Sequence, residues 1–234
     1  MISPTGRPWL DELASATEQF RAVIASAENH DALSTPVAAC PGWDLQELAI
    51  HVGRTHLWAT QILAGADPRD RPQDNPKGPL APWYAGIAEN LRHALAEAGP
   101  HAPCWTLVKE QRTALFWQRR QVHETLVHLW DARSALSQQT EFDKALAFDG
   151  IAEIRDVMYP RMLRAGRVDP LPVSLAISAT DLEAELVVIG EAPEEAVLEG
   201  PAAELLLLLW HRLPWDDTYG DQRAADLVAQ ALVP

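Results

Sequence analysis

Apolar side chains recur at helical spacing through the first 140 residues of the chain. In four segments, apolar positions are separated by three, four or seven residues. These segments cover residues 7–29, 44–63, 82–98 and 112–138. This spacing puts the apolar positions on one face of an α-helix, and that face must pack against another element. Four such helices in succession predict a helical bundle over residues 1–140.

The breaks between these segments are marked by proline, glycine and polar residues. Asp44 is followed three residues later by Glu47, which is the pattern of a capping box at the start of the second helix. Residues 65–82 are rich in proline and charge and have no periodicity. They predict a long exposed loop, and a loop of this length in a compact domain often serves a site as a lid.

The pattern changes after residue 140. Residues 143–165 are helical, and three short apolar or alternating runs bounded by turn residues then predict strands at 173–180, 184–190 and 194–200. Two further helices are predicted near the end, one over "PAAELLLLLWHRL", which starts with proline, and one over the amphipathic "DQRAADLVAQALV". Residues 141–234 are therefore expected to form a small α+β domain, so the fold class is a helical bundle followed by an α+β domain.

Composition and charge narrow the possible functions. Of the 234 residues 47% are hydrophobic, which is typical of a globular chain. The formal charge of −14 disfavours nucleic acid and anionic membranes as partners. There is no apolar run of 18 residues and no secretory signal pattern, and two cysteines do not make a disulfide framework. We therefore expect a cytoplasmic protein.

The fourth predicted helix carries polar residues where a buried face needs apolar ones. Glu124 and His128 are four residues apart, so they project side by side. Arg120 and Asp131 fall near the same stripe, while His123 lies about 100° away. A carboxylate and an imidazole at this spacing can chelate a divalent cation, although most such pairs are simply solvated.

The second predicted helix offers a third ligand. His51 lies on its apolar stripe between two core positions, whereas His56 lies off that stripe. Two imidazoles and one carboxylate, with a fourth position open, form the ligand set of a catalytic zinc site. Such a cation keeps one net positive charge and favours a bound thiolate or hydroxide. The alternative is that His51 is a hydrogen-bonded core histidine.

Several other residues are candidates for supporting roles around this site. Asp131 is either the acceptor for the outer N–H of a ligand histidine or a surface acid. Arg54 and Arg120 are candidates to position an anionic group, and a surface arginine is the alternative for Arg54. Cys40 is a soft ligand, a redox thiol or an inert small residue. His56 and His123 are assigned either to the surroundings of the site or to the surface.

Three stretches resemble the mycothiol-dependent maleylpyruvate isomerase family: "ACPGWDLQELAIHVGRTHLW" (39–58), "FWQRRQVHETLVHLWDA" (116–132) and "AFDGIAEI" (147–154). The C-terminal part is similar to the smaller domain of that family, which is related to sterol-carrier proteins. The resemblance implies a DinB-like four-helix bundle that binds a divalent metal, usually zinc. The family's ligand positions match His51, Glu124 and His128.

The resemblance also implies a reaction. Family members use mycothiol, a low-molecular-weight thiol of actinobacteria, as the metal-bound nucleophile. We therefore expect an isomerase or S-transferase that acts on a small electrophile, as a monomer or homodimer. Two alternatives remain open at this point. One is a non-catalytic metal-containing protein that binds a hydrophobic ligand in its C-terminal domain or acts as a sensor, and the other is a zinc hydrolase.

Overall fold

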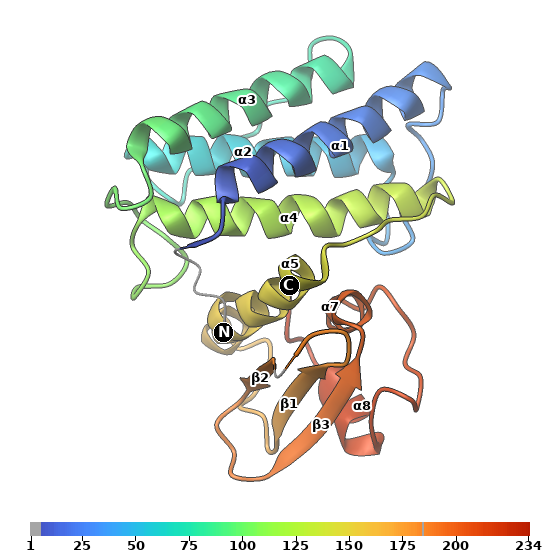
Figure 1. Cartoon of the computed structure of the whole chain (residues 1–234). Helices are drawn as coiled ribbons and strands as arrows, with labels where there is room; N and C mark the ends of the chain where they lie inside the picture. Colours follow the sequence, from blue (N-terminus) through green and yellow to red (C-terminus); the bar gives the residue numbers. More distant parts are fainter. Residues whose placement is uncertain (1–5, 184) are drawn as a thin grey trace. The chain divides into compact units, whose positions relative to one another are not determined.

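The computed structural model describes residues 6–183 and 185–234. The chain divides into two compact units, with the boundary between Thr140 and Glu141. The first unit is helical and the second combines helices with a small sheet (Figure 1). This confirms the predicted fold class of a helical domain followed by a small α+β domain.

The first unit is a bundle in which each helix packs against two others. Helix α1 packs against α3 and α4, and α2 packs against the same two helices (Figure 1). The predicted apolar stripes meet in its core, where Leu13, Phe20, Leu48 and Leu91 are fully buried. The predicted helices correspond to α1 (Trp9–Asn29), α2 (Leu45–Leu63), α3 (Leu80–Ala98) and α4 (Ala114–Ala135).

The start of α2 is fixed by the predicted capping box. The Asp44 carboxylate accepts a hydrogen bond from the Glu47 backbone N–H at 2.9 Å, and the Glu47 carboxylate accepts one from the Asp44 N–H at 3.1 Å. These two bonds satisfy backbone donors that the helix itself leaves without acceptors. They therefore also fix the rotational phase of His51, which lies two turns further along the helix.

Helices α2 and α3 approach closely at Gly53. A Cβ atom at this position would lie 2.6 Å from two ring atoms of Trp83 on α3. We expect Gly53→Ala to lower the free energy of unfolding by about 1–3 kcal/mol, because the ring has to shift. Urea unfolding followed by circular dichroism measures this change.

Gly86 on α3 provides the matched control for this substitution. It is exposed, and an added Cβ would meet nothing within 4 Å. Gly86→Ala is expected to stabilise the protein by up to about 1 kcal/mol through helix propensity alone. If the two variants have the same midpoint, the close approach of Gly53 to Trp83 has no energetic weight.

The loop between α2 and α3 is attached to α2 at two points. The guanidinium of Arg54 donates hydrogen bonds to the carbonyl oxygens of residues 73 and 74 and to the side chain of Asn75, at 2.9–3.3 Å. The guanidinium of Arg71 lies 3.5 Å from the centre of the Trp58 ring, which is a cation–π contact. The predicted exposed loop is therefore held along α2 in an ordered position.

The second unit is built around a three-stranded sheet with β1 in the centre. Strand β1 is antiparallel to β2 and parallel to β3, and Leu175 faces Ile189 on one side and Ala196 on the other. Helices α7 and α8 pack against β3. The strands are β1 (Ser174–Ala179), β2 (Leu186–Ile189) and β3 (Glu195–Gly200), and the helices after them are α7 (Ala202–Leu209) and α8 (Gln222–Val228).

The helical segment that precedes the sheet differs from the expected single helix. It consists of α5 (Lys144–Glu153), the π-helix η2 (Ile154–Met158) and α6 (Tyr159–Arg164). The three predicted strands overlap the observed ones, although position 184, the predicted start of the second strand, lies outside the described residues. Within the described part of the chain, every helix is too short or too polar to cross a membrane.

Candidate metal centre

Three potential metal ligands converge between α2 and α4. The Nε2 atom of His51 lies 3.2 Å from Oε1 of Glu124, and Nε2 of His128 lies 3.5 Å from the same oxygen. The donor atoms of the three residues all lie within 4.8 Å of one another. The centres of the two imidazole rings are 5.1 Å apart, and the rings are nearly perpendicular to one another.

This donor set fits a zinc ion in chemistry and in spacing. Ligands about 2.0–2.2 Å from a tetrahedral zinc ion are separated from one another by roughly 3–4 Å, and the distances of 3.2 and 3.5 Å from the Glu124 oxygen to the two histidine nitrogens fall in this range. The side chain of His51 is 38% exposed, whereas those of Glu124 and His128 are 14% and 11% exposed. The set is therefore accessible to solvent from the His51 side and closed by the bundle on the other.

Arg120 controls the charge of Glu124. The two side chains lie one turn apart on α4, and the guanidinium forms an ion pair with Oε2 of Glu124. Burial opposes ionisation of this carboxyl, but the charge of Arg120 and hydrogen bonds from His128 and His51 hold its pKa well below the ordinary value. Glu124 is thus ionised at neutral pH, with Oε1 directed at the imidazoles.

Asp131 orients His128 from behind. The Nδ1–H of His128 donates to Oδ2 of Asp131 at 2.9 Å, which leaves Nε2 facing Glu124. Burial disfavours the charged imidazolium, but hydrogen bonds with Asp131, Cys40 and Glu124 outweigh it and raise the pKa of His128 well above its ordinary value. A carboxylate behind the imidazole is the arrangement that orients ligating histidines in metalloproteins.

His56 belongs to a buried polar network beside the three donors. Its side chain is fully buried, and its Nδ1–H donates to Oε1 of Gln121 at 2.6 Å. The hydroxyl of Tyr84 donates to His56 Nε2 at 3.2 Å, and the Thr125 hydroxyl lies 3.4 Å from the same nitrogen. The surface alternative for His56 is therefore wrong, because α3 and α4 cover the face of α2 next to the apolar stripe.

His123 is also buried, so the surface alternative is wrong for this residue as well. Its ring contacts the ring of Trp9 edge to face, with 5.8 Å between the centres. The reason is again the packing of the bundle. Helix α1 packs along α4 and covers a face of α4 that the apolar positions of this helix do not predict to be buried.

The buried position of His56 makes the stability of the protein depend on pH. Burial lowers the pKa of His56 to about 4, against 6.5 for an exposed histidine. The unfolded chain therefore binds a proton between these values while the folded chain does not, so acid favours unfolding in this window. We expect His56 to account for a loss of about 3 kcal/mol as the pH falls from 7 to 4.

Urea unfolding at a series of pH values measures this contribution. The difference in stability between the wild type and His56→Gln should change by this amount between pH 7 and pH 4. His101→Gln, which makes the same substitution at an exposed histidine, is measured alongside as the control. If stability depends on pH in the same way in the wild type and in His56→Gln, the predicted contribution of His56 is wrong.

The family models for mycothiol maleylpyruvate isomerase cover nearly the whole chain. The N-terminal domain of the family matches residues 13–133, and its C-terminal domain matches residues 145–234. The chain belongs to the mycothiol maleylpyruvate isomerase family. Its predicted membership is thereby confirmed.

Two crystal structures share the fold of this member of the mycothiol maleylpyruvate isomerase family. One is of the mycothiol-dependent maleylpyruvate isomerase, and the other is of a variant of it with a histidine-to-alanine substitution. They share 14% and 13% sequence identity with this chain, and each has a TM-score of 0.63 over 89% of this chain and 91% of the other. No curated protein sequence matches the chain significantly.

In this member of the mycothiol maleylpyruvate isomerase family, the two predicted arginines lie in different settings. Arg120 is buried and contacts Glu124, so it acts directly on one of the three donors. Arg54 is occupied by the loop between α2 and α3. Its role toward a substrate anion stays a prediction, and it requires the guanidinium to leave the loop.

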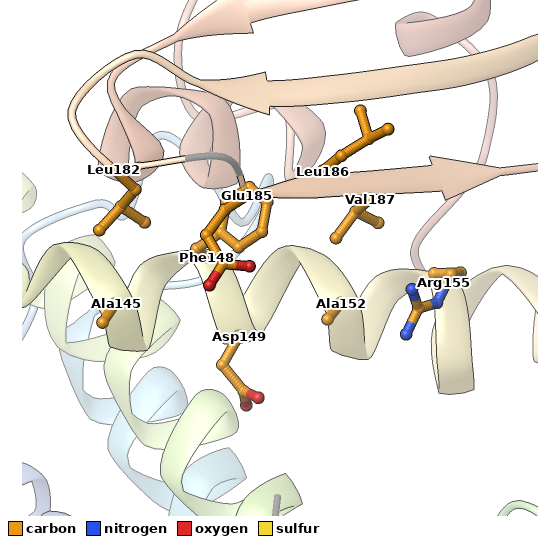
Figure 2. A pocket seen from close by; sticks show the side chains of 9 residues that line it. All are labelled: Ala145, Phe148, Asp149, Ala152, Arg155, Leu182, Glu185, Leu186 and Val187. Atoms are coloured by element: carbon orange, nitrogen blue, oxygen red, sulfur yellow. The ribbon is translucent and has the colours of Figure 1, made fainter. Parts of the chain in front are cut away.

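The C-terminal unit contains a small, mostly apolar pocket between α5 and β2 (Figure 2). Its volume of about 50 Å³ is far below the roughly 300–1,000 Å³ of typical small-molecule sites. The pocket therefore gives no support to a hydrophobic ligand as the main function. Its apolar lining comes from Ala145, Phe148, Ala152, Leu182, Leu186 and Val187, and its charged lining comes from Asp149, Arg155 and Glu185.

Proposed function

We propose that this protein is a metal-dependent enzyme that uses mycothiol to attack a small electrophile. Family membership supports an isomerase-like activity, and similar structures include the mycothiol-dependent maleylpyruvate isomerase. The observation that carries the proposal is the convergence of His51, Glu124 and His128, with His51 half-exposed. A thiol from solvent would have access on that side.

Each residue has a defined part in this proposal. His51, Glu124 and His128 would hold the metal, and Zn²⁺ is a cation that binds two imidazole nitrogens and one carboxylate oxygen. A bound Zn²⁺ would stabilise a thiolate at neutral pH through its charge. Arg120 keeps Glu124 ionised and directs its free oxygen, and Asp131 keeps His128 in the tautomer that presents Nε2.

Two reactions share the first chemical step, in which the thiolate sulfur forms a bond to carbon. In isomerisation, the sulfur adds to a conjugated double bond, the resulting single bond rotates, and elimination returns the thiolate with the opposite geometry. In S-transfer, a leaving group departs and the sulfur stays on the product. The thiol is therefore regenerated in the first case and consumed in the second.

Elemental analysis combined with thermal unfolding tests the proposal. Zinc-loaded protein is expected to gain about 3 kcal/mol from mycothiol at 100 times its dissociation constant, which raises the melting temperature by roughly 6–12 °C. Metal-free protein should show no shift. Oxidised mycothiol, which has no free thiol, is the matched control ligand. Equal shifts with and without zinc would contradict a metal-bound thiol.

Measurement of thiol consumption distinguishes the two reactions. With maleylpyruvate as substrate and mycothiol at one tenth of its concentration, an isomerase is expected to convert all of the substrate. A transferase would stop when the thiol is exhausted. Proton NMR resolves the cis and trans products and any thioether in the same sample.

A further inference from the structure

A second set of metal-ligating side chains lies behind the first and shares His128 with it. The donor atoms of Cys40, His128 and Asp131 all lie within 4.8 Å of one another. The Cys40 thiol donates to Oδ2 of Asp131 at 3.7 Å, and Nδ1 of His128 lies 2.9 Å from the same oxygen. His128 thus presents one ring nitrogen to each set.

The backbone holds Cys40 firmly at this place. The turn before α2 is closed by three backbone hydrogen bonds of 2.9 Å, from Val37 to Trp43, from Cys40 to Val37 and from Trp43 to Cys40. Gly42 has a φ of +87°, which a residue with a side chain rarely adopts. The sulfur is therefore directed toward α4 by a rigid turn, even though it is 91 residues from Asp131 in sequence.

We propose that Cys40, His128 and Asp131 form a binding site for a thiophilic cation such as Cu⁺ or Cd²⁺. A thiolate sulfur with an imidazole nitrogen selects soft cations over the harder ones that oxygen ligands prefer. Asp131 is fully buried, and Cys40 is half-buried, so a cation would enter from the side of the thiol.

Occupation of this site excludes a metal from the first set. When a cation binds Nδ1 of His128, this nitrogen releases to solvent the proton that it donates to Asp131, and the remaining ring proton stays on Nε2, which lies 3.5 Å from Oε1 of Glu124. The thiol proton of Cys40 passes to solvent. His128 can then no longer act as a ligand through Nε2, so the two sites alternate through the tautomer of one histidine.

Titration of the metal-free protein with Cd²⁺ tests this proposal. Thiolate-to-cadmium charge-transfer absorbance should appear and saturate at one equivalent per chain. Cys40→Ser should abolish it, and Cys104→Ser, which changes the other cysteine, should preserve it. Asp131→Asn should weaken cadmium binding while leaving the circular dichroism spectrum unchanged. Lack of the absorbance, or its loss in Cys104→Ser instead, would overturn the proposal.

Competition with zinc tests the shared histidine separately from the proposed function. Zinc loading should raise the Cd²⁺ concentration needed for half-saturation, and His51→Ala should remove most of this effect while keeping the absorbance. If zinc binds the first set without affecting cadmium, the alternation is refuted. If zinc does not bind the first set at all, the proposed enzyme function is contradicted. The cadmium site is then still tested separately, by the thiolate-to-cadmium absorbance of Cys40.

Discussion

Replacement of His51 by alanine is expected to lower zinc affinity by roughly 100-fold or more. Residues that only support a metal ligand typically cost 10–100-fold when they are changed, so loss of a direct ligand should reach at least the upper end. The bundle should remain folded, because the side chain of His51 is 38% exposed and lies at the open edge of the site.

Competition with a chromogenic chelator measures this loss of affinity, and circular dichroism checks the fold. The control is His101→Ala, which removes an exposed histidine that does not belong to the donor set. It should bind zinc like the wild type. Retention of wild-type zinc affinity by His51→Ala would show that the three side chains do not hold the metal together.

Arg120→Met is expected to destabilise the metal-free protein by about 3 kcal/mol. The substitution keeps most of the side-chain volume but removes the cation from a buried pair, which leaves the charge of Glu124 poorly compensated. The melting temperature should fall by roughly 6–12 °C. Zinc should recover much of this loss, because its two positive charges replace the one that was removed.

Arg92 on α3 offers a matched comparison. It pairs with Glu89 at 2.6 Å, but both side chains are substantially exposed, at 35% and 51%. Such surface pairs contribute less than about 1 kcal/mol, so Arg92→Met should shift the melting temperature by no more than about 3 °C. Differential scanning calorimetry with and without zinc compares the two variants, and equal shifts would argue that the Arg120 pair carries no special weight.

The sequence predicts most of the fold because its local signals agree with one another. The apolar stripes and the Asp44–Glu47 capping box place α2 correctly, and alternating or short apolar runs bounded by turn residues indicate the strands. The π-helix η2 escapes prediction, since it interrupts a segment whose periodicity alone indicates one helix. The loop after α2 is predicted to be exposed, but its attachment by Arg54 and Arg71 depends on contacts that no local pattern encodes.

In the candidate site, too, the local pattern was predictable and the contacts between helices were not. The four-residue spacing of Arg120, Glu124 and His128 is enough to place them on one face of α4. The contacts between helices could not be predicted in this way. One example is the pair of buried hydrogen bonds of His56 with Gln121 and Tyr84, which joins three helices. These contacts depend on how the helices pack against one another. The sequence predicts that the helices form a bundle, but it does not predict which side chains meet in it.

The capping box at Asp44 also determines the direction in which His51 projects from α2. His51 lies seven residues after Asp44, which is close to two full turns, so it lies almost directly above the N-cap residue. One inserted residue between them would turn His51 through about 100° and point it away from Glu124. Exchanges of side chains in this short interval should therefore be far better tolerated than any change in its length.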